Sequence, residues 1–293
     1  MEGPVWDREE GYLLFSIASF AGTSASKLVR SASIESGEDQ QKLTRREIMV
    51  MKLIVISAGL LLSVAGVSAA DDGMATKFTV RIENTTKPDA FTASNGEKWS
   101  LAFSPGVAVV HTEKVPIFSA GKKDRGQGLE AQSEDGDPSM LATSLQGGKG
   151  IKSVVAFTTP IGATGPGPIT PGAAYEFTIS GMPGDRLSLT TMMGQSNDWF
   201  YAPAESGIDL FENGKATNGD ITSQMVLWDA GTEVDQEPGI GSDQGPRQKA
   251  PNTGAAENGV VRNAKDVKYG SAYTKVSSVM RVTITPMKAP GSN

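Results

Sequence analysis

Apolar and polar residues alternate with a period of two in short segments of the chain after residue 76. In residues 77–84 the apolar positions are Phe78, Val80 and Ile82, with polar residues between them. This period puts the apolar side chains on one face of a β-strand. The same period recurs at residues 99–103, and further strands are expected at residues 107–111, 151–158, 175–180, 186–193, 224–229 and 277–285.

Clusters of Gly, Pro and Asn separate these segments, as is typical of turns between short strands. The second strand is expected to end at Pro105-Gly106, and one helix is expected to begin at Asp137-Pro138 and to end at Gly147-Gly148. Residues 124–137 are interpreted as a loop whose acids cap the backbone rather than bind metal. The pattern predicts an all-β protein, an antiparallel β-sandwich with one short helix and long loops.

The N-terminal region has the features of a secretory signal. Met51-Lys52 precedes an apolar run, residues 53–67, which ends in small residues at Val67-Ser68-Ala69. A basic start, an apolar middle and a small-residue cleavage site are typical of a signal peptide, and the run is short for a transmembrane helix. We expect cleavage after Ala69 or one residue later, and a secreted or periplasmic protein.

This interpretation divides the chain into three parts. Residues 49–69 are the expected signal peptide, and residues 70–293 the β-sandwich domain. Residues 1–48 are expected to be an upstream extension, with translation beginning at Met49 or Met51. The alternative is a long native N-terminal region that contains Arg45-Arg46.

Composition narrows the classes of function. The net charge is −6 and no basic cluster is longer than Lys122-Lys123, so the sequence predicts no nucleic-acid partner and no anionic membrane surface. Cysteine is absent, and His111 is the single histidine. A Ser-His triad would have to use His111, which has no nucleophile motif near it, and zinc would lack its usual nitrogen and sulfur ligands.

Two acidic segments beside large aromatic residues are the strongest candidates for chemistry. Asp198 directly precedes Trp-Phe, and Asp229 and Glu233 stand on either side of a turn that Gly231 permits. Buried rings would fix the backbone and so orient the carboxylates. Oxygen ligands of this kind suit Ca²⁺, so Asp198, Asp229 and Glu233 are the predicted metal ligands. The alternative is that these acids only cap turns, and Asp209 is a weaker ligand candidate.

These segments also carry a resemblance to a known family. Ser-Asn-Asp-Trp-Phe at 196–200, Leu-Trp-Asp-Ala-Gly-Thr-Glu at 227–233 and Gln-Glu-Pro-Gly-Ile-Gly-Ser-Asp-Gln at 236–244 resemble the spondin N-terminal domain, in particular secreted single-domain bacterial proteins. The resemblance covers roughly residues 77–285. It implies an antiparallel β-sandwich related to membrane-targeting calcium modules, one bound calcium ion and an adhesive, non-catalytic role.

The resemblance places the ligands at the same three positions. They are Asp198, Asp229 and Glu233, the last of which is Asp in animal relatives. The expected function is therefore a secreted, calcium-binding adhesion or recognition module. The loop at residues 234–258 would contact a cell-surface or matrix protein or a glycan.

Two other functions use the same residues differently. A secreted polysaccharide hydrolase would use two of the acids as general acid and base, with carboxyls about 5–9.5 Å apart. An envelope structural protein would use the acids only as turn caps. Trp199, Phe200 and Trp228 are expected in the core, and the alternative for an exposed ring is to stack on a sugar.

Overall fold

The structure is a computed structural model that describes residues 75–114 and 116–288. All of these belong to one compact unit, Ser68–Asn293. The predicted upstream extension at residues 1–48 and the predicted signal peptide at residues 49–69 lie outside the described residues. None of the described helices is both long and apolar enough to pass through a membrane.

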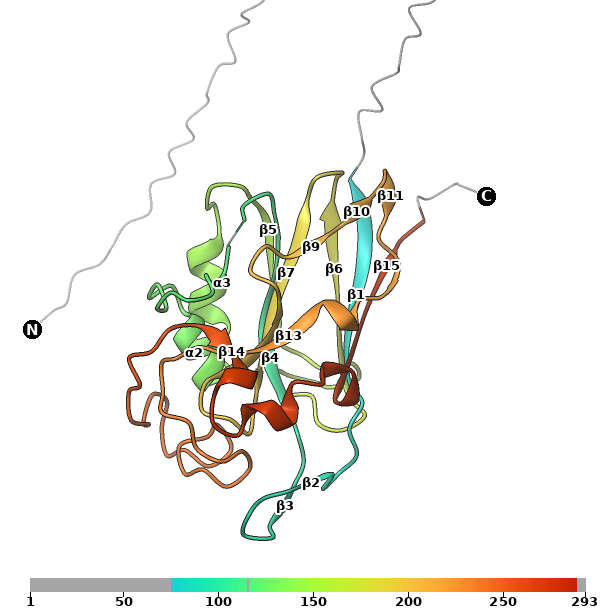
Figure 1. Ribbon diagram of the computed structural model, residues 1–293. Coiled ribbons are helices and arrows are strands. Elements are labelled where there is room, and N and C mark those ends of the chain that lie inside the picture. Colours follow the sequence, from blue (N-terminus) through green and yellow to red (C-terminus); the bar gives the residue numbers. More distant parts are fainter. Residues whose placement is uncertain (1–74, 115, 289–293) are drawn as a thin grey trace, which may run out of the picture. The chain divides into compact units, whose positions relative to one another are not determined.

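The domain is built around two antiparallel sheets (Figure 1). The smaller sheet contains, in spatial order, β12 (Gly219–Asp220), β15 (Met280–Pro286), β1 (Thr76–Asn84) and β6 (Ala174–Gly181). The larger sheet contains β14 (Arg262–Asn263), β13 (Met225–Asp229), β8 (Trp199–Pro203), β7 (Arg186–Met193), β4 (Phe103–His111) and β5 (Ile151–Phe157), and β9 (Ile208–Asp209) pairs with β7.

Shorter elements connect these strands. Two ribbons pair β2 (Phe91–Thr92) with β3 (Lys98–Trp99), and β10 (Phe211–Glu212) with β11 (Lys215–Ala216). The α-helices of the described chain are α2 (Leu129–Glu134) and α3 (Ser139–Leu145). Single 3₁₀ turns occur at Thr222–Gln224, Ala264–Asp266, Gly270–Tyr273 and Val276–Ser278.

The main core lies between the two sheets, as a sandwich requires. Phe78, Val80 and Ile82 of β1 are fully buried in it, on the face that their alternation predicts. The predicted all-β antiparallel sandwich is thus confirmed.

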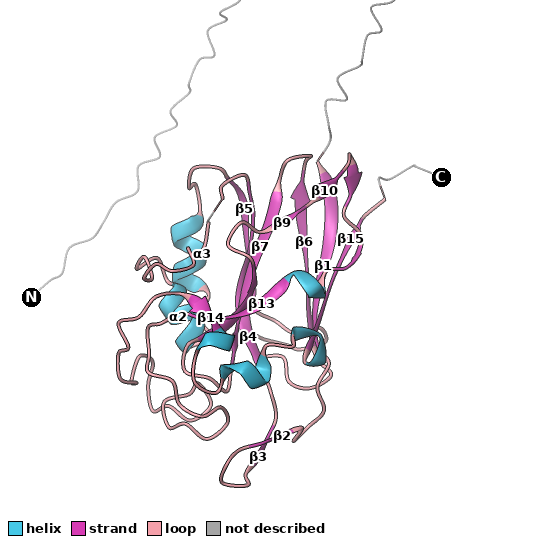
Figure 2. Cartoon of the chain, viewed as in Figure 1, coloured by secondary structure: helices cyan, strands magenta, loops and turns pink. Residues whose placement is uncertain are grey.

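A second core lies on the opposite face of the larger sheet, under α2 and α3 (Figures 1 and 2). Strand β4 contributes to both cores. Its Val107 and Val109 face the helices, and its Ala108 and Val110 face the smaller sheet. A strand covered on both faces is apolar throughout, which explains the continuous valine-rich run.

The predicted end of a strand at Pro105-Gly106 is wrong, because β4 continues through it. The pairing register of β4 with β7 shifts between Phe103 and Gly106, and a bulge of this kind tolerates a proline. At Gly106 an added Cβ would lie 2.0 Å from the Thr190 carbonyl oxygen. Glycine is therefore present for close packing and not for a turn.

Three other elements differ from the prediction. Strand β8 is wholly buried and was not among the predicted strands. Helix α2 occupies part of the expected loop at residues 124–137, and it begins after Gly128, which packs against the backbone of Leu141. Strand β15 begins at Met280 because a 3₁₀ turn precedes it. All three depend on tertiary contacts that short-range patterns do not show.

Candidate metal centre

Two of the predicted ligands are brought together by the pairing of β8 with β13. Asp198 immediately precedes β8, and Asp229 is the last residue of β13, opposite Trp199. Trp199 and Phe200 are 1% and 0% exposed, so the turn that carries Asp198 is anchored in the core. The Trp199 backbone N–H also donates to Ser196 Oγ, 3.1 Å away, which closes that turn.

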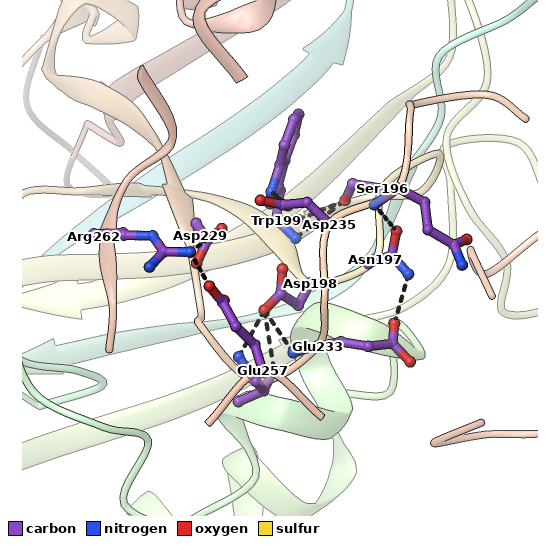
Figure 3. A network of polar contacts seen from close by, with 11 residues as sticks. Ser196, Asn197, Asp198, Trp199, Asp229, Glu233, Asp235, Glu257 and Arg262 are labelled. Atoms are coloured by element: carbon purple, nitrogen blue, oxygen red, sulfur yellow. Dashed lines mark hydrogen bonds and ion pairs between the residues drawn. The ribbon is translucent and has the colours of Figure 1, made fainter. Parts of the chain in front are cut away.

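Asp235 is the third member of the cluster (Figure 3). One carboxylate oxygen from each of Asp198, Asp229 and Asp235 lies within 4.8 Å of the other two. The chain returns to the cluster after Asp229 through a turn at Gly231, where φ is +68° and an added Cβ would lie 2.5 Å from the Val260 nitrogen. Trp199 Nε1 donates to Asp235 Oδ1 over 2.6 Å and fixes that side chain.

The hydrogen bonds of the two buried aspartates are incomplete. Asp198 Oδ2 accepts from the backbone N–H groups of Thr232 and Glu233, over 2.8 and 3.1 Å. Asp198 Oδ1 and both oxygens of Asp229 accept no hydrogen bond from the described residues, although both side chains are 0% exposed. Arg262 Nη2 lies 3.6 Å from Asp229 Oδ2.

Burial without hydrogen-bond partners disfavours the charged form of a carboxylate, so it raises the pKa of each aspartate of the triad. Desolvation by burial is the largest cause that raises the pKa of Asp198. Desolvation, followed by repulsion from Asp198, raises the pKa of Asp229. Burial also raises the pKa of Asp235 to about 6, against the opposing effect of the Trp199 hydrogen bond. The three aspartates therefore form an acidic triad that can hold a metal ion.

Glu233, the third predicted ligand, does not belong to this triad. Its Oε2 accepts a hydrogen bond from Asn197 Nδ2 over 2.9 Å. Its side chain lies so close to Gly254 that a Cβ there would be 1.5 Å from Oε1. Glu233 serves the site through its backbone N–H, which donates to Asp198. Asp209, the weaker candidate, lies in β9 and pairs with Arg186 over 3.2 Å.

Sequence reasoning did not single out Asp235, Glu257 or Arg262. Asp235 belongs to the loop at residues 234–258, which was expected to contact a partner, and no motif in the sequence marks it as a ligand. Arg262 lies opposite Asp229 in the pairing of β14 with β13, and Glu257 precedes it in the same loop. Their proximity to the triad follows from the path of that loop.

Other polar candidates have structural roles. His111 is 0% exposed; its Nε2 lies 2.9 Å from Ser188 Oγ and its Nδ1 lies 2.6 Å from the Glu113 carbonyl oxygen. Both ring nitrogens are thus engaged inside the protein. Trp228 is half-buried and packs against Phe118, with ring centroids 4.9 Å apart.

Comparison of the sequence with models of known protein families and with curated proteins found no match. Functional inference therefore depends on the chemistry of the triad and on its place in the fold.

Proposed function

We propose that this protein is a secreted, non-catalytic recognition module that binds one calcium ion at Asp198, Asp229 and Asp235. The observation that carries the proposal is the set of buried aspartate oxygens without hydrogen-bond partners at the centre of the triad. Unpaired buried charge destabilises a fold, and a cation placed among these oxygens would compensate it.

The chemistry of the donors favours calcium among common cations. The triad offers only oxygen, whereas zinc prefers nitrogen and sulfur. Calcium accepts six to eight oxygens in flexible geometry, at about 2.3–2.6 Å, and takes carbonyls and water beside carboxylates. Magnesium demands a stricter octahedron. Loops such as those that carry Asp198 and Asp235 suit the more flexible ion.

The assignment to a secreted module of the spondin type has two supports. The motifs at residues 196–200 and 227–233, which resemble that family, supply two of the three aspartates. The signal-like pattern at residues 49–69 supports export. Asp198 and Asp229 are both 0% exposed, which favours ion binding over an acid pair acting on a polysaccharide, since such a pair must contact the sugar.

The loop after Asp235 offers the surface for a partner, for which we propose a cell-surface or matrix protein or a glycan. Gln236 donates its backbone N–H to Asn197 Oδ1, next to the triad. Glu237 accepts hydrogen bonds from the N–H and Oγ–H of Ser94, and Arg247 pairs with Glu97, both in the β2–β3 ribbon. Hydrogen bonds and one ion pair thus connect the loop to the buried site and to this ribbon.

Terbium luminescence tests the ion directly, because Tb³⁺ replaces Ca²⁺ and is sensitised by a nearby tryptophan. Trp199 contacts Asp235, so wild type should show sensitised emission that Ca²⁺ removes, with a Kd for Ca²⁺ of about 10⁻⁴–10⁻³ M. Asp229→Asn should abolish the sensitised terbium emission and the binding of Ca²⁺. Asp209→Asn, at an aspartate outside the triad, is the matched control and should behave as wild type.

Two outcomes would contradict the proposal. One is wild-type protein with neither terbium emission nor calcium heat in titration calorimetry. The other is equal calcium affinity in wild type and Asp229→Asn, which would place the ion elsewhere.

A further inference from the structure

Glu257 lies beside the triad because its segment runs along the turn after β13. The Glu257 backbone N–H donates to the Thr232 carbonyl over 2.9 Å, and Gly259 donates to Gly231 over 2.7 Å. Figure 3 shows the Glu257 side chain next to Asp229 and Arg262, on one side of Asp198. The backbone N–H of Thr232 donates to Asp198, so the backbone of Thr232 connects Glu257 to Asp198.

One nitrogen of Arg262 serves two carboxylates at this point. Arg262 Nη2 lies 2.5 Å from Glu257 Oε1 and 3.6 Å from Asp229 Oδ2. The first is a charge-assisted hydrogen bond, and the second is too long for one. Glu257 Oε2 is buried and has no hydrogen-bond partner among the described residues. Asp229 and Glu257 are therefore both incompletely paired, and a single guanidinium is their shared cation.

We propose that Glu257 is a further ligand of the calcium ion, and that Arg262 holds its carboxylate beside the site when the ion is absent. This inference rests on the proposed cation site. Three aspartate oxygens are few for an ion that takes six to eight, and a glutamate can supply two oxygens at once. Rotation about its side-chain bonds carries the Glu257 carboxylate from Arg262 towards the triad, with the paired backbone left in place.

The proposal makes opposite predictions for the two residues. Removing the Glu257 carboxylate should weaken calcium binding, because a ligand is lost. Removing the Arg262 charge should strengthen it, because the guanidinium competes with the ion for Asp229 and Glu257. If Glu257 served only to hold Arg262 in place, its removal would leave the number of water molecules bound to the ion unchanged.

The experiment compares wild type with Glu257→Gln, Glu257→Asp and Arg262→Gln. Calcium titration calorimetry gives the affinity, and terbium lifetimes in H₂O and D₂O report the water molecules bound to the ion. Both Glu257 variants should bind about tenfold or more weakly and gain coordinated water. Arg262→Gln should bind more tightly, without added water. Glu212→Gln, at an exposed acid in β10, is the control and should match wild type.

Glu257→Asp is the decisive variant because it keeps the charge and shortens the reach. Wild-type affinity and hydration in Glu257→Asp would show that Glu257 acts by its charge alone, and would overturn the proposal. So would weaker binding in Arg262→Gln. Wild type that binds no ion would instead refute the cation site itself. Melting curves in chelator establish that each variant is folded, and Arg262→Gln remains informative if a Glu257 variant is not.

Discussion

Asn84 and Asp229 are both wholly buried polar residues at the ends of strands, one in each sheet, and they differ in how their polar atoms are paired. Asn84 Nδ2 donates to the carbonyls of Leu101 and Ile169, over 2.9 and 3.1 Å. Its Oδ1 accepts from the backbone N–H and the hydroxyl of Thr86. Neither oxygen of Asp229 accepts a hydrogen bond from the described residues.

The difference separates a structural role from a role that needs a ligand. Buried polar groups are almost always paired inside a protein, and each exception calls for an explanation. Asn84 is complete in itself and joins β1 to two neighbouring loops. The carboxylate of Asp229 has no hydrogen-bond donor among the described residues, so we expect its partner to be a ligand.

The largest effect is expected at Asn84. Asn84→Ala removes the donor to two buried carbonyls and should lower the free energy of unfolding by about 2–3 kcal/mol. The melting temperature should fall by about 5–10 °C. The control is Asn95→Ala, at an exposed turn residue, which should change the free energy by less than about 0.5 kcal/mol. A loss below about 1 kcal/mol in Asn84→Ala would mean that its hydrogen bonds are replaced by water.

At Asp229 the opposite sign is expected in the absence of metal. Asp229→Asn removes a buried charge that accepts no hydrogen bond and should raise the free energy of unfolding at pH 8 by about 1–3 kcal/mol, measured by urea denaturation in chelator. At about pH 4 the difference should vanish, because the wild-type carboxyl is then protonated. A variant less stable than wild type at pH 8 would show that the carboxylate is well solvated after all.

The stability of the metal-free protein should fall as the pH rises. Burial raises the folded-state pKa of Asp229 above its unfolded value of about 4. The stability linked to this group is therefore present below about pH 4 and is lost as the pH rises through the folded pKa. Asp235 and Glu134, with pKa values raised by burial to about 6 and about 8, add to the same trend. Metal-free wild type should become less stable between about pH 4 and pH 8.

The smallest effect is the stabilisation by calcium. At ten times its Kd, one bound ion should raise the free energy of unfolding by about 1.4 kcal/mol. This corresponds to a rise in melting temperature of about 3–6 °C. Asn84→Ala should keep the whole of this rise, and Asp229→Asn should show none, as differential scanning calorimetry can measure. An equal rise in both variants would remove the distinction between the two residues.

Much of the sandwich could be predicted because the local sequence pattern of several strands is distinctive. Phe78, Val80 and Ile82 repeat with a period of two, and the structure buries all three. Strand β8 and helix α2 could not be predicted in this way. Strand β8 is short, apolar at nearly every position and buried throughout, so it has no alternation. Helix α2 depends on the packing of Gly128 against the following helix.

The part of the site that strand pairing brings together could be predicted from the sequence. Asp198 and Asp229 lie at the ends of β8 and β13, where aromatic anchors mark them in the sequence. Asp235 comes from a loop, and its position depends on a hydrogen bond from Trp199. Spacing could not distinguish Asp235 from Glu233, which lies two residues earlier and whose side chain binds Asn197 instead.

The burial of Asn84 also has a consequence for how the protein can be made. Residues 84–86 read Asn-Thr-Thr, an acceptor sequence for N-linked sugars in eukaryotic secretory pathways. The sugar would be attached to Nδ2, the atom that donates to Leu101 and Ile169 inside the sandwich. A chain modified there before folding could not place this side chain in the interior. Bacterial hosts that lack this modification are therefore the appropriate source of folded protein.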